Sequence, residues 1–315
     1  MTDDRVQEVT SPRTAAGLTF ALICAASFGA SGAMAKGLLA AGWTPAAAVT
    51  ARIVVGALVL LVPGVVALRG RWHLLRENAG FVVGYGLMVT AVTQFAYFSA
   101  IERMQVGVAL LIEYIAPVAV VVWLWLRHGM RPGRLTALGG VVAAVGLVLV
   151  LDLVSGGADL DPLGVAWATL AMIGCATFFV LSAQADNALP PVVLAAAGLA
   201  VGSLGLLGAG AVGLLDMTWT TEPAVYGTTE VAWWIPVLGL GAITCAVSYT
   251  SGIMAVRLLG SRLASFVALL EVLFALLFAW LFLGELPIAV QFVGGALIVA
   301  GVVLVKLGER STARG

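Results

Sequence analysis

Two apolar stretches decide the fold of this chain: MQVGVALLIEYIAPVAVVVWLWL at residues 104–126 and SRLASFVALLEVLFALLFAWLFL at residues 261–283. Each is long enough to cross a membrane as a helix. Each also carries one carboxylate near its centre, Glu113 in the first and Glu271 in the second. A carboxylate in the hydrocarbon core costs a few kcal/mol or more, so it marks a candidate functional site. Two of them, in two related halves of the chain, suggest a transport pathway.

The whole chain has the composition of an integral membrane protein. Of its 315 residues, 62% are hydrophobic and 10% are charged, and the mean hydropathy is +1.09. Soluble domains carry about 25% charged residues. The formal net charge of +0 argues against nucleic acid as a partner. The three cysteines lie inside apolar runs without metal-ligand spacing, and we expect them to pack as small apolar residues.

Ten apolar runs come close to the roughly 20 residues that a helix needs to cross a bilayer. The sequence therefore predicts an all-α polytopic membrane protein with ten transmembrane helices, numbered here as spans 1 to 10. Span 1 lacks a clear signal-peptide cleavage site, and we expect the mature protein to retain it. The spans cover residues 15–36, 45–68, 79–101, 104–126, 134–152, 163–184, 190–214, 232–256, 262–283 and 287–306.

Lysine and arginine predict the orientation of the helices, because cytoplasmic segments are enriched in them. The chain has 16 of these residues, and Arg52 lies within span 2. With a cytoplasmic N-terminus, thirteen fall on the inner side and only Lys36 and Arg103 fall outside. We therefore expect cytoplasmic tails at residues 1–14 and 308–315. The Lys36 side chain, at the outer end of span 1, should extend to the membrane–water interface. The excess of arginine over lysine, with abundant alanine and glycine, is typical of a GC-rich bacterial genome, and we expect the protein in the bacterial plasma membrane.

Spans 1–5 and spans 6–10 are related halves, residues 15–155 and 160–307. An offset of 155 aligns VVGYGLMVTAVTQFAYFSAI at 82–101 with VLGLGAITCAVSYTSGIMAV at 237–256. The same offset aligns GGVVAAVGLVLV at 139–150 with GGALIVAGVVLV at 294–305. Because five is an odd number, the two halves must cross the membrane in opposite directions. Inverted repeats with a site near the midplane are an architecture of secondary transporters.

These stretches resemble the drug/metabolite transporter superfamily, in particular its EamA-type exporters. The resemblance rests on LLEVLFALLFAWLFLGE at 269–285, TARIVVGALVL at 50–60 and the paired glycines of spans 5 and 10. It is nearest to the threonine/homoserine exporter type through ASGAMAKGLL at 30–39 and VALLIEYIAPVAV at 108–120. It covers residues 15–306 and implies ten helices, a central cavity and efflux of small metabolites, often amino acids.

One residue departs from the family pattern. A proline usually follows the span-9 glutamate, whereas Val272 follows Glu271 here. Span 4 does contain Pro117, one turn after Glu113. A proline frees a backbone carbonyl and can bend a helix. We therefore expect a hinge at Pro117 in span 4 rather than in span 9.

Three charged residues inside the spans are the main candidates for a site. Glu113 is a candidate to bind a substrate ammonium or carry a proton, and the alternative is structural pairing with Arg52. Glu271 is its counterpart in the second half, with a helix-packing hydrogen bond as the alternative. Arg52 is a candidate to hold a substrate carboxylate by two parallel hydrogen bonds. Its alternative is a structural contact with a carboxylate or with helix carbonyls.

Polar side chains of other spans are weaker candidates. In span 3, Gln94 and Tyr97 share one helix face with Thr90, and Tyr249 is the counterpart of Gln94 in span 8. This stripe either lines a cavity or makes interhelical hydrogen bonds. Two further candidates for a cavity wall are Ser31 and Tyr114.

Taken together, these features predict a secondary transporter that exports amino acids or related small metabolites by alternating access. The alternatives are an uptake carrier or a drug, sugar or nucleobase transporter of the same fold, and more remotely a membrane enzyme or scaffold. The sequence has no H-E-x-x-H, G-x-S-x-G or P-loop motif, so we expect no enzyme activity, cofactor or metal. The expected partners are the lipid bilayer and a small-molecule substrate, with coupling to a proton left open.

Overall fold

The computed structural model describes residues 12–101, 103, 106–150, 161–184, 188–284 and 286–312. Residues 1–11 and 313–315 of the predicted tails, and positions 151–155 and 160 at the predicted ends of the halves, lie outside this range. Nine helices in the described chain are long and apolar enough to cross a membrane. The 17-residue apolar helix α8 occupies the place of span 5. The predicted all-α membrane fold is confirmed.

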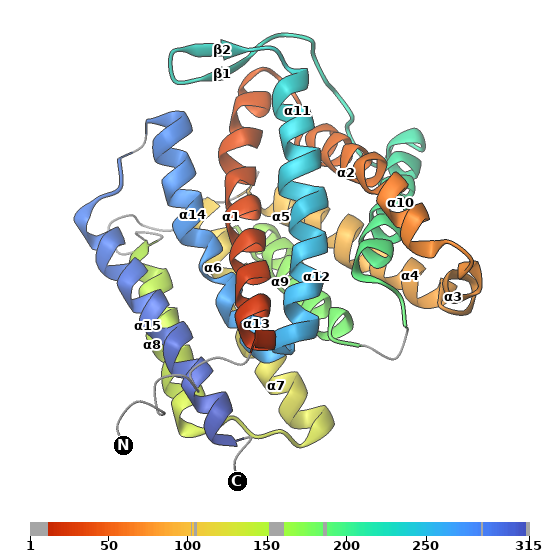
Figure 1. Ribbon diagram of the computed structural model, residues 1–315. Coiled ribbons are helices and arrows are strands. Elements are labelled where there is room, and N and C mark those ends of the chain that lie inside the picture. Colours follow the sequence, from red (N-terminus) through yellow and green to blue (C-terminus); the bar gives the residue numbers. More distant parts are fainter. Residues whose placement is uncertain are drawn as a thin grey trace.

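The first half contains spans 1–5 and one short helix, α3, between spans 2 and 3 (Figure 1). Span 3 is built from three consecutive segments and span 4 from two. The elements are α1 (Pro12–Ala40), α2 (Pro45–Leu68), α3 (Trp72–Glu77), α4 (Ala79–Tyr85), η1 (Gly86–Val92), α5 (Thr93–Ile101), α6 (Val106–Glu113), α7 (Ala116–His128) and α8 (Arg134–Val150).

The second half repeats this order and adds a β-hairpin between spans 7 and 8. Spans 8 and 9 are each built from three segments. The elements are α9 (Pro162–Ser182), α10 (Pro191–Ala211), β1 (Ala224–Tyr226), β2 (Thr229–Val231), α11 (Trp234–Gly241), η2 (Ala242–Val247), α12 (Ser248–Leu259), α13 (Ser261–Ala268), α14 (Glu271–Phe278), η3 (Ala279–Leu283) and α15 (Ala289–Thr312).

Two helices begin at a proline that follows a capping residue. The Thr44 hydroxyl accepts a hydrogen bond from the Ala47 amide at 3.4 Å, at the start of α2. The Asp161 carboxylate accepts one from the Leu163 amide at 2.8 Å, at the start of α9. Caps of this kind satisfy amides that the first turn leaves unpaired, and a proline there loses no helical hydrogen bond. The local sequence therefore fixes where both helices enter the membrane.

The packing of α8 on α15 is reciprocal between the two halves. A Cβ added at Gly139 would lie 2.7 Å from the Gly301 carbonyl oxygen, and one added at Gly146 would lie 2.6 Å from that of Gly294. By the offset of 155, Gly139 corresponds to Gly294 and Gly146 to Gly301. Each glycine thus contacts the counterpart of the other, as a two-fold axis between the helices requires. The backbones approach closely because neither surface carries side chains at these positions.

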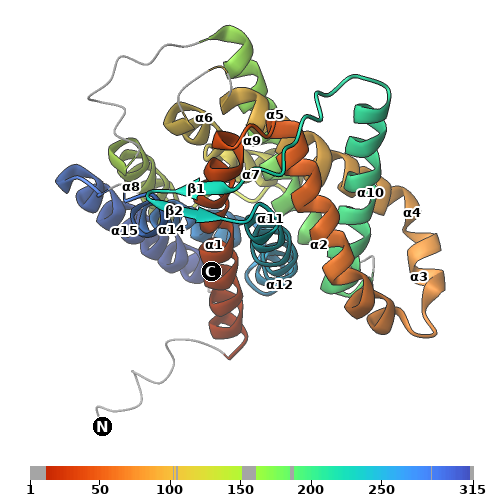
Figure 2. The same cartoon turned by 90° about the horizontal axis from the view of Figure 1, so that it is seen from above.

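The helix bundle places this pair at one edge and spans 2 and 7 at the other. Seen from above, α8 and α15 lie on one side of α1, and α2 and α10 lie on the opposite side (Figure 2). In Figure 1 the first residues of α1 and the last turn of α15 lie at the same face, opposite the hairpin. An even number of membrane crossings produces this arrangement.

Spans 3 and 8 each contain a π-helical segment at matching positions. Residues 87–92 of η1 correspond to residues 242–247 of η2 by the offset of 155. In each span the next two residues, Thr93 and Gln94 or Ser248 and Tyr249, line the central cavity described below. Single π-helical turns inside α-helices often occur at functional sites. The sequence did not reveal either segment.

The connection between spans 7 and 8 forms the hairpin β1–β2 over the end of α1. The Tyr226 hydroxyl donates a hydrogen bond to the Met34 carbonyl oxygen at 2.6 Å. Its ring occupies the space where a side chain at position 37 would lie, because residue 37 is glycine. Beside it, Trp43 contacts the rings of Trp219 and Trp233 at centroid distances of 6.1 and 6.0 Å. This loop is therefore packed onto the first two spans.

Candidate functional site

A central cavity of about 550 Å³ is lined by residues from both halves of the chain. Its lining is mainly apolar and aromatic, with a few polar and charged side chains. Their part in substrate binding stays a prediction, but the structure does bring them to one place. Thr90 of the polar stripe does not line this cavity and instead donates an interhelical hydrogen bond to the Gly198 carbonyl oxygen at 3.0 Å. The other candidate site residues that the sequence singled out do line it: Glu113, Glu271, Arg52, Gln94, Tyr97, Tyr249, Ser31, Tyr114 and Pro117.

Span 4 and span 9 are both interrupted beside the cavity. Residues 114–115 separate α6 from α7, and residues 269–270 separate α13 from α14. The two breaks are related by the offset of 155. The structure places such a break next to Pro117 in span 4 and also in span 9, where no proline occurs, and the expected hinge at Pro117 stays a prediction. In membrane proteins, interrupted helices are tolerated where they face a cavity or buried protein.

The two carboxylates lie on opposite sides of these breaks. Glu113 is the last residue of α6, whereas Glu271 is the first residue of α14. The offset of 155 pairs Glu113 with Ala268, so the glutamates are not equivalent in the structural repeat as the sequence suggested. A helix N-terminus favours negative charge and a C-terminus disfavours it. The site therefore gives its two carboxylates different electrostatic surroundings.

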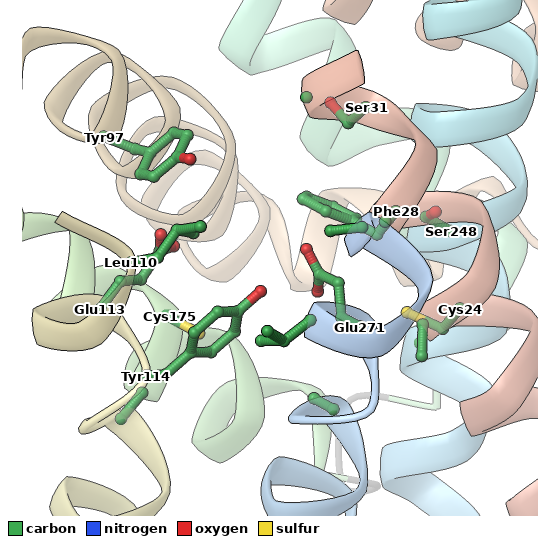
Figure 3. A pocket seen from close by; sticks show the side chains of 18 of the residues that line it. Cys24, Phe28, Ser31, Tyr97, Leu110, Glu113, Tyr114, Cys175, Ser248 and Glu271 are labelled. Carbon is green, nitrogen blue, oxygen red and sulfur yellow. The ribbon is translucent and has the colours of Figure 1, made fainter. Parts of the chain in front are cut away.

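Glu113 and Glu271 face each other across the cavity (Figure 3). The hydroxyl of Tyr114 is directed toward the Glu271 carboxylate, and Tyr97 lies on the side of Glu113. Both glutamates are partly exposed, because the cavity reaches them. Within the described residues neither carboxylate has an ion-pair partner. The cavity thus offers two carboxylates to a cationic group.

Arg52 is held by the protein itself. Its guanidinium donates hydrogen bonds to the Gln94 side-chain oxygen at 3.0 Å and to the Thr244 carbonyl oxygen at 2.7 Å. It also lies 4.7 Å from the centre of the Phe28 ring. Among the described residues no ion pair joins it to Glu113, so the suggested pairing with that residue was wrong. The alternative of contact with a helix carbonyl is confirmed.

Sequence reasoning missed the aromatic wall that surrounds Arg52 and Glu271. The ring of Tyr249 lies 6.3 Å from that of Phe28 and 6.1 Å from that of Phe178. An offset of 150 aligns ALICAASF at 21–28 with AMIGCATF at 171–178, which pairs the two phenylalanines. That alignment of spans 1 and 6 would have found them. Two cysteines of the same stretches, Cys24 and Cys175, also line the cavity.

The cavity extends toward the face that carries the hairpin. Lys36, in the last turns of α1, is exposed there and contributes to the lining. At the opposite end, Phe179, Val256 and Ala264 are less than a tenth exposed and belong to one packed cluster. The lining therefore reaches the hairpin face and ends at a closed apolar layer near the face of the termini.

The comparisons with known proteins agree with this architecture. The model of the EamA-like transporter family matches residues 15–152 and 162–307. An uncharacterized transporter of Archaeoglobus fulgidus is 29% identical over 212 residues, which cover 67% of this chain and 71% of that protein. A solved crystal structure shares the fold at 20% identity, with a TM-score of 0.74 over 95% of this chain and 98% of the other. The two matched regions span both halves, and this chain belongs to the EamA-like transporter family.

Proposed function

We propose that this protein exports amino acids or related small metabolites with an amine group across the bacterial plasma membrane. The observation that carries the proposal is the pair of carboxylates, Glu113 and Glu271, that face each other across a cavity between two inverted halves. A protonated amine is the group that two such carboxylates would bind. The aromatic and aliphatic lining would hold the apolar part of the same molecule.

The proposed mechanism is alternating access. The two halves would rock about the cavity, so that it opens first to the cytoplasm and then to the outside. The breaks at residues 114–115 and 269–270 would be the hinges. There the i→i−4 hydrogen bonds of the α-helix give way to i→i−3 bonds, as from the Ile115 and Leu270 amides. Glu113 and Glu271 would bind the substrate amine in one phase and a proton in the other.

A second candidate function is efflux of organic cations without a carboxylate. It is favoured by the contacts of Arg52, whose guanidinium is already bonded to Gln94 and Thr244 and lies on Phe28. A substrate carboxylate would have to displace these contacts. An organic cation needs only the two glutamates and the aromatic wall.

Counterflow in proteoliposomes separates the two candidates. Vesicles would be loaded with one unlabelled compound, and entry of the labelled compound would be followed at two pH values. An amino-acid exporter gives counterflow with at least one amino acid, whereas an organic-cation exporter gives it only with cations. Absence of counterflow with every amino acid and amine, from protein shown to be folded, would overturn the proposal.

A further inference from the structure

A second hollow adjoins the central cavity on the membrane-facing side of spans 9 and 10. It is a groove of about 600 Å³ between α14, η3 and the first half of α15. Its lining is apolar apart from Gln291, and several lining residues are exposed on the outside of the bundle. Trp280 is 45% exposed and Phe292 is 68% exposed. The groove therefore opens toward the hydrocarbon of the bilayer.

The groove and the central cavity share part of their walls. Leu276 of α14 and Gln291 of α15 line both spaces. Leu276 follows Glu271 by five residues, which is about 7.5 Å along a helix. The shared wall thus lies within the length of a short alkyl chain from the carboxylate that would bind an amine.

The shared wall is formed by only a few side chains. α15 packs closely along α8 and against α13. Gly295 of α15 leaves room for the Leu273 side chain, since a Cβ added at position 295 would lie 2.9 Å from the Leu273 Cδ2 atom. The groove lies between α14 and η3 on one side and α15 on the other. The π-helical geometry of η3 replaces a regular α-helical turn at that place.

The side-chain amide of Gln291 is hydrogen-bonded to backbone groups at both its nitrogen and its oxygen. Its side-chain nitrogen donates a hydrogen bond to the Val150 carbonyl oxygen at 2.9 Å, and its oxygen accepts one from the Ile288 amide at 2.9 Å. Both hydrogen-bonding ends of the amide are therefore occupied by backbone groups. An alkyl chain that passes Gln291 would leave these bonds intact, so the wall is apolar in effect.

We propose that the groove receives the apolar tail of an amphipathic amine whose ammonium group lies at Glu271. This inference rests on the proposed function, since it needs the glutamates to bind an amine. It adds that the substrate class extends to amines with a long apolar chain, and that the chain leaves the cavity between Leu276 and Gln291 toward the bilayer. With such a ligand bound, the two spaces would act as one elongated site with a charged end and an apolar end, joined where Leu276 and Gln291 line both.

Binding of alkyltrimethylammonium ions with chains from ethyl to dodecyl tests this proposal. Affinities would be measured on purified protein in nanodiscs for the wild type, Ala296→Phe and Ala144→Phe. Ala296 is an exposed residue of α15 that lines the groove. Ala144 is an exposed residue of α8 that lines neither space, so it receives the same change away from the groove. Partition of the ligand into lipid is the same for all three proteins.

Ala296→Phe should bind the ethyl compound as the wild type does but bind the dodecyl compound roughly tenfold more weakly. That factor corresponds to about two methylenes losing their place in the groove. Ala144→Phe should follow the wild type at every length. A dodecyl compound with a photoreactive group at its tail end should label α14, η3 and α15 in the wild type.

The outcomes separate this inference from the proposed function. If the ethyl compound binds through Glu271 and chain length has the same effect in all three proteins, the groove inference is wrong and the proposed function stands. If no compound of any length binds folded wild-type protein, the groove inference is wrong, and counterflow with amino acids decides the proposed function separately. Photolabelling confined to other membrane-facing helices would also overturn the groove inference.

Discussion

The positions of Glu113 and Glu271 could be predicted from the sequence only in part. Their depth in apolar runs predicted that they would meet in one cavity, because a carboxylate in the bilayer must face water, a partner or a ligand. Their relation to helix ends could not be predicted, since no proline marks the break before Glu271. Arg52 likewise stood out by its charge, but its neighbours Gln94, Thr244 and Phe28 depend on packing between helices distant in sequence.

Arg52→Lys should destabilise the protein by about 2 kcal/mol, because an ammonium cannot keep both hydrogen bonds and lie on the Phe28 ring. Thermal unfolding in detergent measures the effect. Arg127→Lys, at an exposed position near the end of α7, is the matched control and should unfold like the wild type. Unchanged stability of Arg52→Lys, together with weaker substrate binding, would instead make Arg52 a substrate ligand.

At the scale of elements, the glycines of α8 and α15 show how the sequence encodes the packing of two related helices. Their spacing of seven residues was visible in the sequence and predicted related spans, and the structure shows that they are the contact surface. Other element features left no such signal. The π-helical segments and the hairpin arise from packing against neighbouring helices, and the apolar sequence of a span does not report its local hydrogen-bond pattern.

Gly146→Ala should destabilise the bundle by roughly 1–3 kcal/mol, because the new methyl group would lie 2.6 Å from the Gly294 carbonyl oxygen. Gly84→Ala is the control, since nothing lies within 4 Å of the position of its added Cβ. Unfolding of both variants would be compared in the same detergent. Equal stability of the two would contradict the close approach of α8 and α15.

The hairpin gives a prediction about pH outside the spans. Burial raises the pKa of Tyr226 from its ordinary 10.0 to about 12. A folded-state pKa above the unfolded value means that the stabilisation is complete below pH 10.0 and is lost as the pH rises toward 12. The tyrosinate absorbance that the wild type has and Tyr226→Phe lacks should therefore appear only as the pH approaches 12. A difference in absorbance that titrates near pH 10.0 would instead show that the Tyr226 hydroxyl is exposed to water.

The whole molecule was the most predictable level, because membrane crossing imposes length and polarity on every span. The offset of 155, found in two separate stretches, predicted the inverted halves. The substrate is the least predictable property, since it depends on the shape and lining of the cavity. Phe28, Phe178, Cys24 and Cys175 line that cavity from α1 and α9, whose relation appears only at a different offset.

The charge distribution makes a prediction for the orientation of the whole molecule. In a variant without the three native cysteines, Thr228→Cys in the hairpin turn should react with a membrane-impermeant thiol reagent on intact cells. Arg131→Cys, in the exposed connection between α7 and α8, should react only after the membrane is permeabilised. Both should react after permeabilisation, which serves as the control. The reverse pattern on intact cells would invert the topology.

The most direct test of the central claim is counterflow through Glu113→Gln, Glu271→Gln and Glu230→Gln. Each change removes one negative charge with almost no change in shape, and Glu230 is an exposed residue of the hairpin. If the two cavity carboxylates form the site, the first two variants should lose at least tenfold in counterflow rate with the identified substrate, and Glu230→Gln should retain the wild-type rate. Wild-type rates and pH dependence in both cavity variants would contradict the account.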